Sequence, residues 1–233
     1  MKKMKSSFSI IIPVLHESLI INRTIEHIRR IGSGFEFEII VVDGDKEGGT
    51  INFIKHNDVV KIVSPMGRGI QMNKGASAAK GDVLLFLHTD TELPEEAFGG
   101  ISSVIDNREY TGGAFDLGIE SGRWIFRLIE KLVFVRTRAT RIPYGDQAIF
   151  IRRECFETLK GFKDIPIMED VEFMRRLKKS GYKISIIPQK VKTSSRRWER
   201  EGVLYCTVRN WVLISLYSIG VKPEKLVKLY YPE

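Results

Sequence analysis

Three continuous apolar segments in the first ninety residues restrict the fold of this chain more than any other feature. They cover residues 8–15, 38–43 and 83–87, are rich in β-branched or large side chains, and do not alternate with polar residues. Such segments are typical of strands buried on both faces of a sheet. Because segments with helical spacing separate them, the order predicts a mainly parallel sheet with right-handed crossovers, flanked by helices. A weaker strand is predicted at residues 59–63, and the helical segments are residues 20–28, 51–54 and 70–79.

Acidic residues stand where each of the strong strands ends. Glu17 follows the first strand, Asp43 ends the second and Asp90 follows the third. Any one of them fits an ordinary turn. In a parallel sheet, however, the carboxyl ends of the strands share one edge, and ligands bind outside that edge. Three acids there predict a ligand site.

His88 and Asp90 indicate the chemistry of that site. If the third strand continues through both residues, their side chains point to the same face. An imidazole and a carboxylate suit a divalent cation, Mn²⁺ or Mg²⁺, with substrate phosphate oxygens completing its shell. Residues 67–75 add a glycine-rich helix start, where backbone N–H groups with Arg68 or Lys74 could hold an anion. The alternative interpretation of residues 67–75 is a plain turn before a helix.

A further carboxylate lies in the segment 165–177. Helical spacing gives this segment an apolar stripe that includes Val171 and Met174, and Asp170 falls inside the stripe. A carboxylate on the apolar side needs a partner or a purpose. Asp170 is therefore either a general base or an acid favoured by the first turn of a helix. Glu169 points elsewhere on the helix and is expected to orient a partner.

Positive charge is concentrated in the second half of the chain. Residues 1–120 carry a formal net charge of −4 and residues 121–233 carry +12. This predicts either an anionic partner for the second half or a solvated basic face. Arg197 and Trp198 lie in a basic run, where they could clamp a diphosphate and wall an acceptor pocket. No groove-reading motif accompanies them, so nucleic acid is not expected as a partner.

The later elements predict an α/β domain over residues 1–200 and a helical extension over residues 201–233. Residues 202–221 are apolar, but Arg209 and Asn210 interrupt them and leave too short a run to span a bilayer. This segment either packs on the domain or lies at a membrane interface. The same alternatives apply to the basic amphipathic segment 123–138. A helix at residues 94–107 and a strand at 112–119 complete the prediction.

Cysteine use and the N-terminal residues bear on location. The two cysteines, Cys155 and Cys206, lack metal-ligand spacing, which fits core positions in a reducing compartment. The first apolar run is short and breaks at Pro13, so no signal peptide is expected. A cytoplasmic location is predicted, with peripheral contact to a membrane left open.

The order of these motifs resembles the inverting glycosyltransferases of family 2, which have a GT-A fold. The resemblance covers most of the chain, from SIIIPVLHE near the start to RRW near the end. VVDGDKEGGT resembles the family's DGSSDDGT, GRGIQMNKGA its ARNxG stretch, HTD its metal motif and MEDVEF its ED motif. The resemblance implies a mixed, mainly parallel α/β sheet with C-terminal helices.

The resemblance also implies a reaction. A sugar would pass from a nucleoside-diphosphate sugar, with UDP favoured over GDP, to a hydroxyl of a small-molecule or lipid acceptor. Asp170 would deprotonate that hydroxyl, and a single displacement would invert the anomeric carbon. Asp90, with or without His88, would hold a Mn²⁺ or Mg²⁺ ion on the diphosphate. The donor would contact Glu17, Asp43, Arg68, Gln71, Asn73 and Asp90, and the acceptor or diphosphate side would contain Asp146, Gln147, Glu169, Arg197 and Trp198.

Two departures from the family pattern narrow the prediction. HTD replaces the usual DxD, and SSRRW replaces the QxxRW of processive members, which argues against a polymer synthase. HTD, GRGIQMN, GDQAIF and RRWER together resemble a bacterial branch labelled arsenosugar-biosynthesis or radical-SAM/selenodomain-associated glycosyltransferases.

Two alternatives remain open at this point. A nucleotidyltransferase would share the layout and the metal, but it would place a glycine-rich, Lys- or Arg-bearing signature where this chain has PVLHES. The second alternative is a non-catalytic protein that binds an anionic ligand through its basic half.

Overall fold

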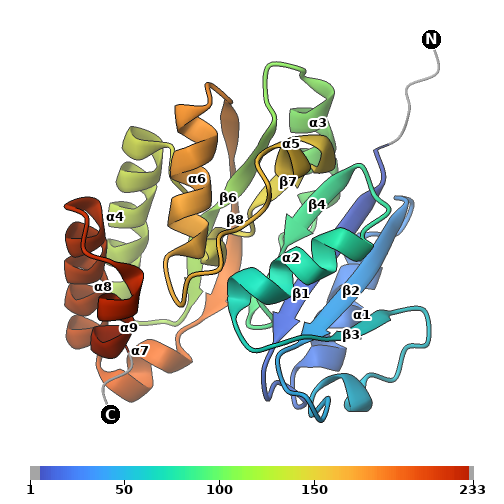
Figure 1. Ribbon diagram of the computed structural model, residues 1–233, viewed down its shortest axis with the longest axis horizontal. Helices are drawn as coiled ribbons and strands as arrows, with labels where there is room; N and C mark the ends of the chain where they lie inside the picture. Colours follow the sequence, from blue (N-terminus) through green and yellow to red (C-terminus); the bar gives the residue numbers. More distant parts are fainter. Residues whose placement is uncertain (1–5, 231–233) are drawn as a thin grey trace.

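Within residues 6–230, which a computed structural model describes, the chain forms one eight-stranded sheet with helices on both faces (Figure 1). The strand order is β3-β2-β1-β4-β7-β6-β8-β5, and four of the seven pairings in this part of the chain are parallel. The predicted mixed, mainly parallel α/β sheet is therefore confirmed. The strands are β1 Phe8–Val14, β2 Phe37–Asp43, β3 Val60–Val63, β4 Val83–Phe86, β5 Thr91–Glu92, β6 Gly112–Glu120, β7 Phe150–Arg152 and β8 Ile184–Ser194.

Helices alternate with these strands along most of the chain and follow one another at its end. The α-helices are α1 Ile21–Ile31, α2 Arg68–Ala78, α3 Ala97–Asp106, α4 Trp124–Thr140, α5 Arg153–Thr158, α6 Glu169–Lys179, α7 Arg196–Glu201, α8 Val203–Ser218 and α9 Pro223–Tyr230. Two short 3₁₀ helices are η1 Ile51–Phe53 and η2 Gly145–Gln147.

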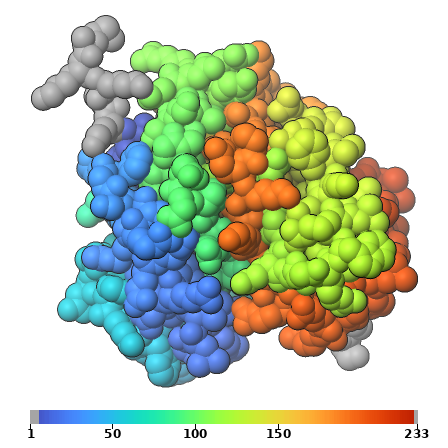
Figure 2. Space-filling view, turned by 180° about the vertical axis from the view of Figure 1, so that it is seen from behind, coloured from blue at the N-terminus to red at the C-terminus, as the bar shows by residue number. Residues whose placement is uncertain are grey.

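Two apolar clusters, one on each face of the sheet, hold the helices in place. α1, α3 and α4 contribute to the cluster that contains Phe8 and Ile12 of β1, while α2, α5 and α6 contribute to the cluster that contains Ile11. Figure 1 shows α2 and α6 on the near face, and Figure 2 shows the opposite face. Successive β1 side chains thus enter opposite layers, which explains why its sequence is continuously apolar.

The parallel pairing of β1 with both β2 and β4 sets the position of the site. Val14 lies opposite Asp43 in β2, and Ile11 lies opposite Phe86 in β4. The carboxyl ends of the three strands therefore meet at one edge of the sheet, as predicted from the acids that follow them.

The condition under which His88 and Asp90 would share a strand face, that β4 continues through both residues, is not met. β4 ends at Phe86, and a turn follows, in which the Thr91 N–H donates to the His88 carbonyl at 3.1 Å. Beyond the turn, β5 pairs with β8 in antiparallel fashion. Strand periodicity therefore cannot explain why His88 and Asp90 come together, and the turn does so instead.

Two other elements differ from prediction. The helix predicted at residues 51–54 is a single 3₁₀ turn, η1 at Ile51–Phe53, and hydrogen bonds from the Thr50 and Ile51 N–H groups to Asp43 shape this segment. β8 was not predicted, since Pro188 interrupts it and lysines occupy exposed positions along it. A register shift between Phe115 and Asp116 of its partner β6 accommodates the interruption.

The C-terminal helices pack against the segment that leads into α6. Ile167 shares an apolar cluster with Leu213 of α8 and Leu226 of α9. The division of the chain at residue 200 stays a prediction. Along residues 6–230, no helix has the combination of length and apolarity needed to cross a membrane.

Gly75 provides a test of the packing of α2 on the sheet. A Cβ at this position would lie 2.5 Å from Ile11 Cγ2 and 3.1 Å from Val42 Cγ2, both in central strands. We expect Gly75→Ala to lower the free energy of unfolding by about 1–2 kcal/mol, because the clash outweighs a helix-propensity gain of about 1 kcal/mol. Urea denaturation measures this. Gly99→Ala in α3, where a Cβ meets nothing within 4 Å, should stabilise instead, and an equal response from both variants would contradict the packing.

Candidate active site

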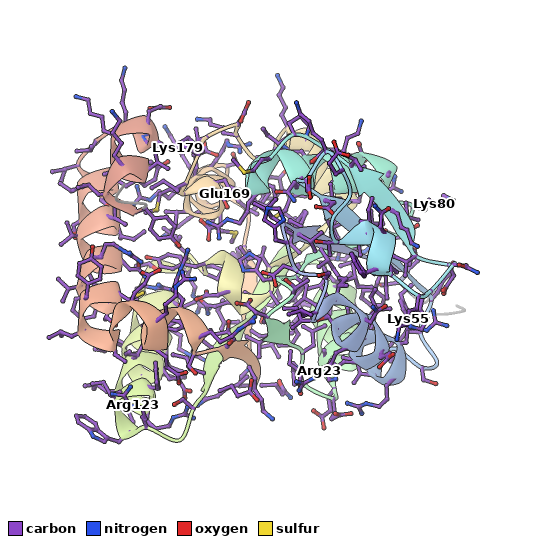
Figure 3. All side chains as sticks on the ribbon, turned by 90° about the horizontal axis from the view of Figure 1, so that it is seen from below. Arg23, Lys55, Lys80, Arg123, Glu169 and Lys179 are labelled. Atoms are coloured by element: carbon purple, nitrogen blue, oxygen red, sulfur yellow. The ribbon has the colours of Figure 1, made fainter. Side chains whose placement is uncertain are left out.

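A cavity of about 210 Å³ opens at the carboxyl edge of the sheet, between α6, α8 and the turn after β4. We call it the site cavity. Figure 3, which labels Glu169, shows α6 nearly end-on, with α2 on one side and α8 on the other. The predicted residues that line the site cavity are Arg68, His88, Asp90, Asp146, Asp170, Arg197 and Trp198.

Asp170 is held in a fixed orientation at the start of α6. Its Oδ1 accepts the Val171 N–H at 2.7 Å, and its Oδ2 accepts the Gly145 N–H at 2.6 Å. Val171, with the rest of the predicted stripe, is buried, but Asp170 itself is only half-buried at the wall of the site cavity. The remaining lone pairs of its carboxylate are free to face a ligand.

Glu169 lies on the other side of the same helix turn and pairs with Arg68. Its side chain is almost fully buried, and Arg68 Nε lies 3.0 Å from its Oε1. Burial raises the pKa of Glu169, while the Arg68 guanidinium opposes the rise. The pair joins the start of α6 to the start of α2. Glu169 therefore orients the Arg68 guanidinium at the edge of the cavity.

His88 is neutral at physiological pH. Burial and the nearby Arg68 guanidinium lower its pKa to about 4, although Asp90 and Asp170 oppose the change. A Cβ added to Gly145 would lie 3.2 Å from His88 Nε2 and 3.3 Å from Asp170 Oδ2. A side chain at residue 145 would therefore be in tight contact with His88 and Asp170, and glycine leaves both of them room.

Asp146 carries a carboxylate oxygen without a partner. Its Oδ1 is buried and has no hydrogen bond among the described residues, although Asp146 lines the site cavity. Burial raises the pKa of Asp146 to about 6, against the opposing charge of Arg136. A buried, unsatisfied oxygen costs free energy and marks a place where a ligand group could bind.

Gln147 is used within the protein. Its Oε1 accepts from Arg136 at 2.8 Å and from the Tyr144 N–H at 3.2 Å, and its Nε2 donates to the Phe115 carbonyl at 2.9 Å. The Arg136 guanidinium also stacks on the Tyr144 ring, 3.4 Å from its centroid. Gln147 thus fixes the η2 turn, and its predicted contact with an acceptor stays a prediction.

Asp43 is likewise occupied by backbone donors. Its Oδ2 accepts from the Thr50 and Ile51 N–H groups at 2.7 and 3.1 Å, and its Oδ1 accepts from the Asp45 N–H at 3.0 Å. Asp43 therefore shapes the loop after β2, and its contact with a nucleotide stays a prediction. Thr50 connects this loop to the end of β1, because its Oγ1 accepts the Glu17 N–H at 3.0 Å.

Glu17 lies within electrostatic reach of the cavity. Burial, followed by the negative charge of Asp90, raises the pKa of Glu17, and Arg196 opposes the rise. Two of the acids that follow separate strands, Glu17 and Asp90, thus influence each other electrostatically.

Gln71 and Asn73 of α2 are structural in their visible contacts. The Gln71 Nε2 donates to the carbonyls of Val14 and Val42 at 2.8 Å each, joining the ends of β1 and β2. Asn73 exchanges two hydrogen bonds with the backbone of Phe162. Neither residue lines the site cavity, so their donor contacts stay predictions.

Arg197 and Trp198 of α7 line one wall of the site cavity. Arg197 pairs with Glu201 at 3.5 Å and bonds to the Tyr230 hydroxyl, while Trp198 packs edge-on against Phe126. Sequence reasoning missed Tyr144, Asn210 and Tyr230, which also line the cavity. For Asn210, the available sequence signal was the polar interruption that Arg209 and Asn210 make in an apolar segment.

His88 and Asp90 supply two of the groups that a divalent cation needs. Within residues 6–230, no three His, Cys, Asp or Glu side chains converge as a complete metal site. A neutral imidazole and a carboxylate that line one cavity nevertheless fit a cation that takes its other ligands from phosphate and water.

The strand order and the cavity at the carboxyl edge define a GT-A fold, and solved structures share it. The mannosyltransferase PcManGT from Pyrobaculum calidifontis, in complex with GDP-Man and Mn²⁺, superposes with a TM-score of 0.69. It is 18% identical, with 95% of this chain and 67% of the other covered. S. aureus TarS 1–349 in complex with UDP-GlcNAc gives a TM-score of 0.61 at 17% identity, with 96% and 70% covered.

The sequence identifies the family. The profile described as Glycosyl transferase family 2 matches residues 9–160, and the chain belongs to this family. A PGL/p-HBAD biosynthesis glycosyltransferase from Mycobacterium bovis is 28% identical over 182 residues, which cover 65% of this chain. An equally similar protein of the same description occurs in Mycobacterium tuberculosis. The chain spans 61% of the length of these curated relatives.

The unsatisfied carboxyl of Asp146 predicts a pH-dependent effect on stability. The unfolded chain releases this proton near pH 3.8, whereas the folded chain releases it near pH 6. The wild type therefore loses stability as pH rises through this window, and Asp146→Asn should not. We expect the variant to be more stable by about 1–3 kcal/mol at pH 7.5, with the difference disappearing towards pH 4. Urea denaturation across this range measures it. Asp164→Asn at an exposed position is the control, and a difference that does not vary with pH would refute the assignment.

Proposed function

We propose that this protein transfers a sugar from a nucleoside-diphosphate sugar to a hydroxyl acceptor, with inversion at the anomeric carbon. The observation that carries the proposal is the convergence of Asp170, His88 and Asp90 on one cavity at the carboxyl edge of a GT-A sheet. Membership of Glycosyl transferase family 2 supports it.

Asp170 is the proposed general base. Two backbone N–H groups fix its carboxylate, so it can accept the proton of an acceptor hydroxyl without reorganising. The acceptor oxygen then forms a bond to the anomeric carbon as the bond from that carbon to the diphosphate oxygen breaks. The electron pair of the broken bond leaves with the nucleoside diphosphate, and the proton stays on Asp170.

The leaving diphosphate needs positive charge near it. Arg68 and Arg197 line the cavity and can bind phosphate oxygens through their guanidinium groups. Asp90 and the neutral His88 would hold a divalent cation, which would stabilise the charge that develops on the diphosphate. The Mn²⁺ in the PcManGT complex supports this assignment.

The acceptor side is proposed to include Asp146 and Trp198. The unpartnered Asp146 Oδ1 can accept a hydrogen bond from a second hydroxyl of the acceptor, and Trp198 offers an apolar surface to a sugar ring. The preference for UDP over GDP, the arsenosugar-type branch and a cytoplasmic location remain proposals of the same kind.

Asp170→Asn separates catalysis from donor binding. We expect kcat to fall by about 10²- to 10⁴-fold, because the amide cannot accept the acceptor proton. Calorimetric binding of UDP or GDP with Mn²⁺ should stay near the wild-type value. Full activity in this variant would eliminate Asp170 as the base.

Asp90→Ala is the complementary variant. It should abolish the Mn²⁺-dependent part of nucleotide binding, since one of the two protein ligands of the cation is removed. Binding of UDP and GDP that is insensitive to Mn²⁺ in both wild type and variant would show that the cation site is wrong. Release of pyrophosphate instead of a nucleoside diphosphate would indicate a nucleotidyltransferase.

A further inference from the structure

α8 turns an apolar stripe towards solvent. Leu204 is 78% exposed and Trp211 57%, and Val208 and Val212 are exposed between and beside them. At about 100° per residue, these four positions fall within roughly 100° of the helix circumference. Ile219, which is 79% exposed, follows directly after the end of the helix. A stripe of this kind normally faces a core, so an exposed one indicates an interaction surface.

α4 carries a second stripe with the same geometry. Trp124 is 75% exposed, and Leu128, Leu132 and Val135 follow it on the same side of the helix, all exposed. Figure 1 and Figure 2 place α4 and the C-terminal helices at the same end of the molecule. We call the exposed apolar residues of α4 and α8 together the α4–α8 face.

Exposed cations outnumber exposed acids around the α4–α8 face, although Glu199 of α7 and Glu224 of α9 are also exposed. α8 contains no acidic residue, and Glu130, the one acid of α4, is buried and paired with Arg127 and Lys190 at 2.8 Å. Exposed cations stand beside the stripes on α4 and on the neighbouring α7 and α9: they are Arg123, Lys131, Arg200, Lys222, Lys225 and Lys228. Apolar and aromatic side chains within a basic rim are complementary to an anionic lipid surface.

We propose that the α4–α8 face docks on an anionic lipid bilayer. The exposed tryptophans would enter the interface between head groups and acyl chains, and the basic rim would contact lipid phosphates. A second copy of this chain fits less well, because it would bring one basic rim against another.

Docking would also bring the bilayer close to the chemistry. The side of α8 opposite the exposed stripe lines the site cavity through Cys206, Asn210 and Ile214. One helix diameter, about 10 Å, would then separate the membrane from the cavity. A short distance between bilayer and cavity would suit a sugar acceptor carried by a lipid. This part of the inference rests on the proposed function.

Vesicle sedimentation tests the proposal. The protein is mixed with vesicles of phosphatidylcholine alone or with 30% phosphatidylglycerol, a composition on the order of an anionic leaflet. We expect binding to the anionic vesicles, weakened by salt, and little binding to phosphatidylcholine. Val208→Glu and Lys131→Glu should each reduce binding at least tenfold, while Phe53→Glu, an exposed apolar position in the N-terminal part of the fold, should not.

A second measurement needs no variant. Brominated acyl chains quench tryptophan that enters a bilayer, so the wild-type fluorescence should fall on anionic brominated vesicles and not on their unbrominated counterparts. Absence of both sedimentation and quenching would overturn the proposal. A concentration-dependent dimer that Val208→Glu dissociates would assign the face to a second copy instead.

The two proposals fail separately. Calorimetric binding of UDP or GDP with Mn²⁺ in solution tests the donor site without lipid. Loss of vesicle binding in Val208→Glu with unchanged nucleotide binding supports docking alone, and vesicle binding without any nucleotide binding would refute only the proposed function.

Discussion

The hydrogen bond from the Gly145 N–H to Asp170 Oδ2, at 2.6 Å, is the contact on which the site depends. It joins the η2 turn, which precedes β7, to the first turn of α6. α6 packs on the face of the sheet that contains Ile11. The absence of a Cβ at Gly145 leaves room for His88 Nε2 and Asp170 Oδ2 beside this N–H group. Gln147, whose side-chain amide has four hydrogen-bond partners, holds the turn that presents this N–H group. The buried side-chain amide of Gln147, two residues after Gly145, thus helps to orient the Asp170 carboxylate.

The electrostatic character of the cavity follows from the same packing. Burial keeps His88 neutral and raises the pKa values of Asp146 and Glu169. Each carboxylate therefore carries a free-energy cost that a partner can relieve. Arg68 relieves it for Glu169, whereas no hydrogen bond among the described residues does so for Asp146 Oδ1. A cavity with one satisfied and one unsatisfied acid is prepared to bind polar ligand groups rather than to maximise stability.

The sequence predicted the parts of this structure that depend on periodicity and missed those that depend on geometry. β1, β2 and β4 were predictable because strands buried on both faces are continuously apolar. β8 was not, since it lies half-exposed beside β6 and contains Pro188. The strand-end pattern predicted Asp43 and the family resemblance implied Gln147 as site residues, but only the structure shows which protein groups already occupy their side chains. The convergence of His88 and Asp90 was predicted for a reason that the turn after Phe86 contradicts.

α8 shows why hydropathy alone misjudges the end of the chain. Its sequence resembles a membrane span interrupted by Arg209 and Asn210, yet these polar residues face inward. Arg209 is buried and lies 2.6 Å from Glu201, and Asn210 lines the site cavity. The apolar stripe of Leu204, Val208, Trp211 and Val212 consequently faces outward, while Leu213 packs inward. The ion pair and the cavity thus fix which side of α8 is exposed, and the same contacts that build one wall of the active site leave its apolar stripe uncovered.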